Sequence, residues 1–417
     1  MLDIDFVRSQ YAAFNTGAYA GTAFFENAGG SCIPRQVLMP FSEFLTDYKV
    51  QPYAPYAASE RAGEVMDQGY ATIIEWLGAQ PDEITIGPST TLNTYVLANA
   101  MAPSIREGDE IIVTNQDHEA NIGCWRRLES RGARIIEWQI DPVSGLLNVD
   151  DLAGLLTDRT RLVCFTLCSN IVACVHDIRR ITDMVRQAGA LSIGDGVSFA
   201  PHRLLDVRAS GLDFFFFSTY KTFAPHTGVM WGRSEVLSEL PAQGHFFNSD
   251  LSRYRMNPTG PLHAEIAALS GLRNYFEELY AHHFKDRSAN IPSDNFRQRS
   301  EAVYDLFHDH EQQLATQLLD FLNQQHGVRI IGKSDVAGGD RASTIAFTSD
   351  RVASSDIASR LGEHGIGVSS GHFYAIRCIE ALNIDPADGV VRASMVHYNT
   401  ADEVARLTGA LDEILNG

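Results

Sequence analysis

The chain has 417 residues, of which 45% are hydrophobic and 20% are charged, and its formal net charge is −19. Such a length exceeds what one small core needs, so we expect a large domain joined to a smaller one. The strongly negative charge argues against nucleic acid or an anionic membrane surface as a partner.

The first residues, MLDIDFVRSQY, lack the basic segment and apolar run of a signal peptide, and no later run is long enough to span a membrane. The six cysteines are Cys32, Cys124, Cys164, Cys168, Cys174 and Cys378. Cys164 and Cys168 fall in or beside a strand-like run, where a buried structural thiol is the commoner outcome. No zinc-ligand spacing stands out, so we expect a reduced, cytoplasmic protein without a metal site.

A run of small hydroxyl residues opens a helix-like segment in IGPSTTLNTY, with Ser89, Thr90 and Thr91 at its start. The free N–H groups and the dipole at such a start attract an anion such as a phosphate. The same residues also suit a plain helix cap, so the pattern is compatible with either role.

Strands and helices alternate between residues 108 and 218. GDEIIVTNQDHEAN and ARIIEWQI read as strands around the helix-like IGCWRRLES, and the continuous apolar run RLVCFTLC predicts a strand covered on both faces. Next comes a helix with Asp177 as its N-cap and Gly189 at its end, followed by the strands ALSIGD and DFFFFS. These βαβ units predict a mostly parallel sheet in an α/β fold.

The polar segment 282–299 is expected to be a boundary or an insertion. Beyond it we expect a long amphipathic helix over 301–325, strands at 329–333 and 343–349, and a C-terminal helix over 401–415. This pattern predicts a smaller α+β domain. The predicted parts are therefore an N-terminal arm (1–20) packed on the small domain, a large domain (21–282) and a small domain (283–417).

Two charged residues follow buried strands of the predicted large domain. Asp195 ends the apolar run of one strand, and Lys221 lies just past the end of the next. A pyridoxal 5'-phosphate (PLP) enzyme needs this pair, because the lysine forms a Schiff base and the carboxylate pairs with the protonated pyridine nitrogen. By spacing alone, a surface lysine and a capping acid are the commoner outcome.

Seven motifs occur in an informative order: FFENAGGSCIPRQV, NQDHEANIGCW, LCSN, GDGVSFAPH, STYK, SSGHFYA and VVRASMVHYNT. From about Phe24 to its C-terminus the chain thereby resembles fold-type I PLP enzymes of the class V aminotransferase family, in the cysteine-desulfurase-like branch. The resemblance implies a large domain with a mostly parallel, seven-stranded type of sheet and a smaller α+β C-terminal domain. It also implies a homodimer with shared active sites.

The resemblance assigns roles around the cofactor ring. Lys221 is expected to form the Schiff base, and Asp195 to pair with the pyridine nitrogen. His118 is expected to stack on the ring, and Asn170 to lie beside the ring hydroxyl. Ser198 occupies a position where desulfurases commonly carry glutamine, and it is expected near the same hydroxyl.

The remaining expected contacts concern the phosphate and the substrate. The expected phosphate-binding residues are Ser89, Thr90, Thr91, Ser218 and Tyr220, with Thr259 and Gly260 supplied by a neighbouring subunit. Arg392 aligns with the arginine that binds the α-carboxylate of the substrate, a planar group that a guanidinium holds with two parallel donors. Asn27, Gly29 and Gly30 are expected in a close-approach loop at the substrate entrance.

The loop SSGHFYA departs from the desulfurase pattern, because Tyr374 holds the position of the mobile catalytic cysteine. Tyrosine cannot take up sulfur as a persulfide, and Cys378, four residues on, is expected to be a buried helical cysteine. Tyr374 is expected to contact the substrate instead.

The expected reaction begins when an α-amino acid displaces Lys221 from the cofactor and the freed lysine removes the Cα proton. We expect a carbon–sulfur lyase that eliminates a β-substituent from a cysteine-like substrate. The alternative is a class V aminotransferase or an amino-acid epimerase, and a more remote one is an inactive PLP-fold binding protein.

Overall fold

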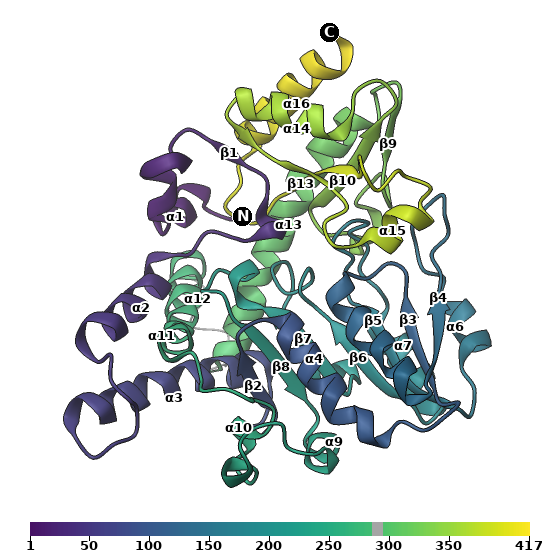
Figure 1. The fold of residues 1–417 in the computed structure, drawn as a ribbon. Helices are drawn as coiled ribbons and strands as arrows, with labels where there is room; N and C mark the ends of the chain where they lie inside the picture. The colour runs from purple at the N-terminus through teal and green to yellow at the C-terminus, as the bar shows by residue number, and fades with distance from the viewer. Residues whose placement is uncertain (286–294) are drawn as a thin grey trace.

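A seven-stranded sheet lies at the centre of the larger part of the molecule, and the computed structural model describes residues 1–285 and 295–417 (Figure 1). In spatial order its strands are β2 (Ile84–Gly87), β8 (Gly228–Gly232), β7 (Phe214–Ser218), β6 (Leu191–Asp195), β5 (Thr160–Thr166), β3 (Glu110–Thr114) and β4 (Arg134–Trp138). Neighbours from β7 to β4 pair in parallel, whereas β8 is antiparallel to both β7 and β2. The prediction of a mostly parallel sheet in an α/β fold is confirmed.

Strand β7 contains four consecutive phenylalanines because both of its faces are buried. The side chains of Phe215 and Phe217 belong to one core, which also contains Trp76, whereas Phe214 and Phe216 belong to a second core with Leu97. Trp76 lies on α3 (Ala57–Leu77) and Leu97 on α4 (Thr90–Met101), so helices cover both faces of the sheet. A strand buried on both faces has no solvent side on which polar residues would be favoured.

The other helices of this part follow the chain between and after the strands. They are α2 (Arg35–Asp47), α5 (Gly123–Arg126), α6 (Val149–Leu155), α7 (Ile178–Gln187), α8 (Val207–Ser210), α9 (Ser234–Glu239), α10 (Ser252–Arg255), α11 (His263–Ala268) and α12 (Ser270–His283). Asp177 caps α7 through a hydrogen bond from the N–H of Arg180, and Gly189 follows the helix with a φ of 76°, as predicted. The helix expected over 122–130 is instead a short α5 continued by a 3₁₀ segment, Arg127–Arg131.

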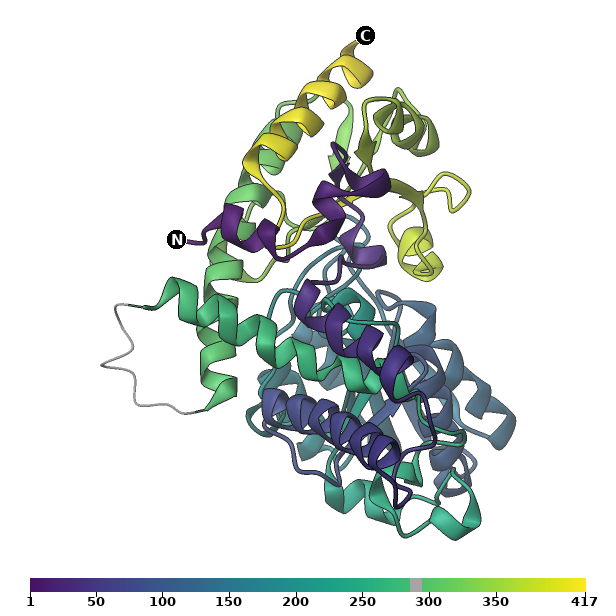
Figure 2. The same cartoon turned by 90° about the vertical axis from the view of Figure 1, so that its left-hand side faces the viewer.

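A smaller antiparallel sheet occupies the C-terminal part, in the order β12 (Ser369–Gly371), β13 (Val390–Ser394), β10 (Thr344–Ser349) and β9 (Val328–Ile330). Its helices are α13 (Phe296–Leu322), α14 (Ser354–Glu363), α15 (Ile376–Ala381) and α16 (Ala401–Asn416). Figure 2 shows α16 beside α13, and the two helices are in contact. A short parallel pair, β1 (Ala23–Phe24) and β11 (Ile366–Gly367), joins the N-terminal segment to the C-terminal part.

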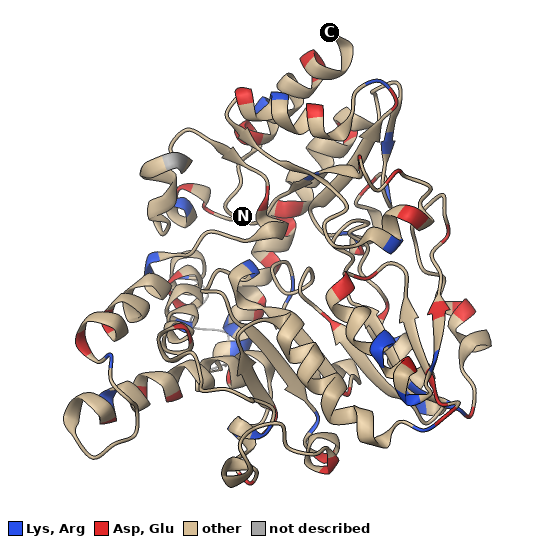
Figure 3. Ribbon diagram, in the orientation of Figure 1, with Lys and Arg blue, Asp and Glu red and all other residues tan. Residues whose placement is uncertain are grey.

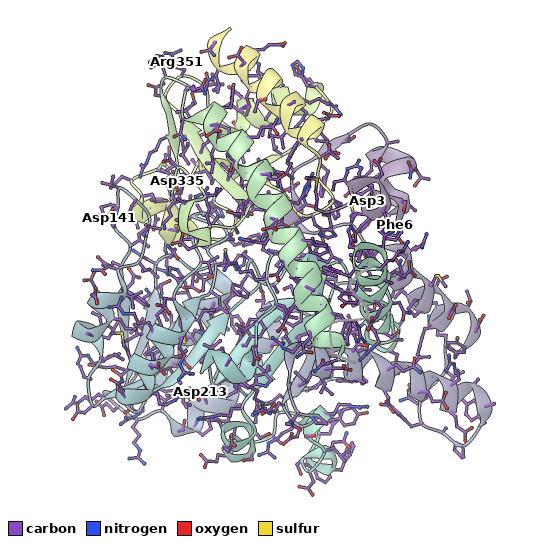
Figure 4. The ribbon with its side chains drawn as sticks, turned by 180° about the vertical axis from the view of Figure 1, so that it is seen from behind. Asp3, Phe6, Asp141, Asp213, Asp335 and Arg351 are labelled. Atoms are coloured by element: carbon purple, nitrogen blue, oxygen red, sulfur yellow. The ribbon has the colours of Figure 1, made fainter. Side chains whose placement is uncertain are left out.

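Helix α13 links the two parts of the molecule, as Figure 4 shows from behind. Its first half, including Phe307, packs in the core under the large sheet, and its second half, including Leu318, packs in the C-terminal core. The N-terminal helix α1 (Ile4–Ser9) contacts the C-terminal part through the Arg8–Glu403 ion pair at 3.0 Å. The domain limits stay predictions, and residues 286–294 of the expected boundary segment lie outside the described residues.

Acidic and basic residues of both signs are interspersed along the ribbon (Figure 3). Among the described residues, no helix combines the length and the apolar composition that crossing a bilayer requires.

Candidate active site

A cavity of about 440 Å³ lies at the carboxyl ends of β5, β6 and β7, where α/β sheets commonly bind ligands. The predicted site residues that line it are Thr90, Thr91, His118, Asn170, Asp195, Ser198, Ser218, Tyr220 and Lys221. Four further residues line the cavity without a role predicted from the sequence: Ala120, Thr166, Val197 and Cys168, which was expected to be a structural thiol only. Thr166 could have been found, because it ends β5 just as Asp195 ends β6.

Lys221 lies in a 3₁₀ turn, Thr219–Lys221, directly after β7. Its side chain is buried, and its ammonium group makes no hydrogen bond or ion pair within the described part of the chain. Burial and, to a smaller extent, the positive charge of Arg392 lower the pKa of Lys221 to about 8, with Asp195 partly opposing both effects. The lysine therefore exchanges a proton readily near neutral pH.

Asp195 is buried at the end of β6, and its Oδ1 accepts a hydrogen bond of 2.8 Å from the N–H of Val197. Burial raises the pKa of Asp195, which the Val197 bond and Lys221 partly offset. A second buried acid, Asp117, has its pKa raised to about 8 by burial and by the nearby charge of Asp195. Because Asp195 lacks an ion-pair partner within 1–285 and 295–417, a bound cation would stabilise its charged form.

His118 is half-buried at the start of a 3₁₀ turn, and its Nδ1 accepts a hydrogen bond of 3.1 Å from the N–H of Ala120. Burial and, to a smaller extent, the cations Lys221 and Arg392 lower the pKa of His118 to about 3. The imidazole is therefore neutral at physiological pH. A neutral, flat ring on the cavity wall is suited to stack on another flat ring.

Arg392 and Asn170 contact each other beside the cavity. The Nη1 of Arg392 donates to the backbone oxygen of Asn170 at 3.2 Å, and its guanidinium lies 3.7 Å from the centre of the Phe373 ring. The Nε of Arg392 is buried without a hydrogen-bond partner, as is the Oδ1 of Asn170. Burial lowers the pKa of Arg392 to about 10, which leaves it charged at neutral pH. An unpaired guanidinium edge is suited to receive a carboxylate.

The N-terminus of α4 reaches the same cavity. Ser89 caps this helix by accepting a hydrogen bond of 3.1 Å from the N–H of Leu92, and Thr90 and Ser218 share a hydrogen bond of 2.8 Å between their hydroxyls. A side chain at Gly228 would come within 2.3 Å of the backbone of Ser89 and Thr90, so only glycine fits there. The first-turn N–H groups, which a helix leaves without intrahelical partners, can hold a phosphate.

Other predicted residues lie outside this cavity. Asn27 is buried and lines a smaller neighbouring cavity of about 250 Å³ together with Lys221, and a side chain at Gly30 would contact the Tyr220 ring. Tyr374 is 70% exposed, and its ring centre lies 5.3 Å from that of His118. Gly29 belongs to the same 3₁₀ turn as Asn27, Asn27–Gly29.

Thr259 and Gly260 line a separate cavity of about 640 Å³ in this chain. The single chain therefore does not bring them to Lys221, and their supply by another subunit stays a prediction.

Taken together, these groups fit PLP, a flat pyridine ring with a hydroxyl and a phosphate. Lys221, the free oxygen of Asp195 and the Oδ1 of Asn170 have no partners of their own among the described residues, and the start of α4 offers donors for the phosphate. The class of protein that this fold and site define is a PLP-dependent enzyme.

The aminotransferase class-V family model matches residues 23–264 and 298–407, and the chain belongs to this family. It is 34% identical to an aminotransferase-like protein of Gibberella zeae, over 99% of this chain and 98% of that protein. It is also 29% identical to a cysteine desulfurase-like protein of Aspergillus flavus, over 100% of this chain and 91% of that protein.

Solved structures show the same fold. A cysteine desulfurase of Escherichia coli matches with a TM-score of 0.82 and 24% identity, covering 100% of this chain and 99% of that one. A cysteine desulfurase of Thermococcus onnurineus matches with a TM-score of 0.84 and 20% identity, with the same coverage of both chains.

Replacing Lys221 with alanine is expected to abolish the Schiff-base absorbance band of the cofactor-loaded protein, because PLP could then bind only non-covalently. In the wild-type apo-protein, covalent attachment of PLP should quicken as the pH rises towards about 8 and then level off, since only the uncharged amine attacks. Stopped-flow absorbance measures both. Lys333→Ala, at the partly buried Lys333–Asp340 ion pair, is the control. An unaltered band in Lys221→Ala would contradict the assignment.

Proposed function

We propose that the protein acts on an α-amino acid as a carbon–sulfur lyase that eliminates a sulfur-bearing β-substituent without forming a protein persulfide. The observation that carries the proposal is that the loop 372–375 contains no thiol, while Lys221 and Arg392 are both available to an amino acid. The family assignment supports the PLP chemistry, and the desulfurase-like relatives support a sulfur-containing substrate.

The thiol that lines the cavity and the thiol that follows the loop are both poorly suited to accept sulfur. Cys378 is fully buried in α15, and Cys168, although it lines the cavity, is only 1% exposed. Burial raises the pKa of both thiols. Because only the thiolate is a good nucleophile, each would react slowly at neutral pH.

Each residue of the site has a separate role in the proposed reaction. Arg392 binds the α-carboxylate, and Lys221 takes the Cα proton and delivers a proton to the leaving sulfur. His118 covers one face of the ring and excludes water from it. When bound, PLP supplies an electron sink for the negative charge left at Cα, and Asp195 keeps the pyridine nitrogen protonated. Loss of the Cα–H and Cβ–S bonds gives a thiol and, after hydrolysis, a keto acid and ammonia.

Transamination is the second candidate, because the relative from Gibberella zeae is named aminotransferase-like. It needs the same carboxylate-binding arginine and the same lysine base. In transamination the keto-acid product keeps its side chain and the amino group passes to an acceptor, whereas elimination releases the sulfur fragment, so product analysis separates the two reactions. Epimerisation differs in the face of Cα that is reprotonated.

Mass spectrometry of products is the direct test. With cysteine, cystine or an S-substituted cysteine, the PLP-loaded protein is expected to release a keto acid, ammonia and the sulfur fragment. Cys168→Ser and Cys378→Ser should give the same products, whatever their rates. Alanine with a persulfide that either variant loses would overturn the proposal. A keto acid that keeps its sulfur side chain would indicate transamination, and an inverted α-centre would indicate epimerisation.

Replacing Arg392 with alanine should raise KM for the amino acid by about 10- to 100-fold, because a charge-assisted hydrogen bond contributes roughly 1.5–3 kcal/mol. Arg392→Lys keeps the charge but not the two parallel donors, and it should fall between the wild type and alanine. Steady-state kinetics with one substrate measures the series. An unchanged KM in Arg392→Ala would remove Arg392 from the carboxylate site.

We also propose a cytoplasmic homodimer in which each subunit lends Thr259 and Gly260 to the phosphate site of the other. Exposed apolar side chains near that segment support a covered face: Tyr53, Phe246, Phe247 and Leu251. Sedimentation of the loaded protein should give twice the chain mass of 46.0 kDa. Thr259→Ala should weaken PLP binding without changing that mass. A monomer with full PLP affinity would exclude the shared site.

A further inference from the structure

The segment Asn27–Cys32 lies between the strand that carries Arg392 and the turn that carries Lys221. On the first side, the Nδ2 of Asn27 donates to the backbone oxygen of Ser394 at 2.7 Å, and the N–H of Ala28 donates to the Ser394 hydroxyl at 2.8 Å. Ser394 ends β13, two residues after Arg392. The segment is therefore anchored to the strand that presents the guanidinium.

On the other side, Ser31 contacts the chain both before and after Lys221. The N–H of Ser31 donates to the backbone oxygen of Tyr220 at 2.9 Å, and its hydroxyl donates to the same oxygen at 3.2 Å. The hydroxyl also accepts a hydrogen bond of 3.0 Å from the N–H of Phe223. Ser31 thus contacts residues on both sides of Lys221, although it lies far from them in the sequence.

Phe223 shows that this turn needs an external partner. Its φ is 68°, in the left-handed region, which is strained for a side chain of this size. The residue is fully buried, and its ring meets the His397 ring edge-on, with centres 4.6 Å apart. Strained backbone of this kind persists where its surroundings fix it, and Ser31 supplies the partner for its N–H.

The charges in the site make such an anchor necessary. Lys221 and Arg392 are both buried, and neither has an ion-pair partner among residues 1–285 and 295–417. Like charges repel, and the effect of Arg392 on the pKa of Lys221 shows that the two groups interact. Their separation must therefore be held through the backbone, and the segment Asn27–Cys32 contacts both sides.

We propose that Ser31 is a positioning residue for Lys221, which fixes the lysine turn to the segment anchored beside Arg392 and so sets the base relative to the bound amino acid. The proposal rests on the role of Lys221 and not on the type of reaction. It therefore stands whether the products are those of a lyase or of a transaminase.

The first test needs no variant. Hydrogen exchange of the Phe223 amide is measured by NMR on the wild-type protein, with and without PLP. The Ser31 bond predicts strong protection in both forms. An amide that exchanges at the rate of an unprotected one would overturn the proposal, even if every Ser31 variant failed to fold.

The second test compares Ser31→Ala with Ser31→Thr, which keeps the hydroxyl. Ser300→Ala is the matched control, because its buried hydroxyl bonds only within α13. Ser31→Ala should speed Phe223 amide exchange by at least about 10-fold. It should also move the pH titration of the resting visible absorbance upwards, because a loosened lysine is less buried and less exposed to Arg392.

Kinetics completes the test. In Ser31→Ala, kcat should fall by about 10-fold or more with a smaller change in KM, since a misplaced base slows the proton transfer but not carboxylate binding. Ser31→Thr and Ser300→Ala should match the wild type in all three readouts. If Ser31→Ala exchanged faster at Phe223 but kept the wild-type titration and kcat, Ser31 would be only structural and the proposal would be wrong.

Discussion

Two buried positive charges face one site, and much of the structure serves to hold them there. Lys221 and Arg392 come from different sheets, and neither has a carboxylate partner among the described residues. Burial and mutual repulsion both disfavour this arrangement. A site with an excess of positive charge is instead complementary to anionic groups, such as the phosphate of PLP and the substrate carboxylate of the proposed function. Binding of such anions would offset the repulsion between the two cations.

That arrangement requires a rigid support. Both faces of β7 are packed, with Phe215 and Phe217 in one core and Phe214 and Phe216 in another, so the strand that leads to Lys221 cannot tilt without disrupting two cores. Helix α13 packs in the core under the large sheet and in the C-terminal core, and so connects the strand of Arg392 to the same framework. The loops at the strand ends can then carry polar, strained or unpaired groups that the scaffold itself could not tolerate.

The environment of the thiols supports the proposal that no protein persulfide forms. Tyr374 lies in the exposed loop, and the buried thiols of Cys168 and Cys378 have raised pKa values. The guanidinium of Arg392 lies over the Phe373 ring, so the same loop covers one face of that guanidinium.

The sequence by itself determined the parallel sheet, the cap at Asp177 and the positions of Asp195 and Lys221, because apolar periodicity, capping and strand ends are local patterns. It also gave the motif residues that carry the family resemblance. Only the tertiary structure decided that Cys168 lines the cavity, that Asp117 is a second buried acid, and that Ser31 brackets the lysine. Burial and contacts between distant segments are properties of the folded chain as a whole, so no local pattern encodes them.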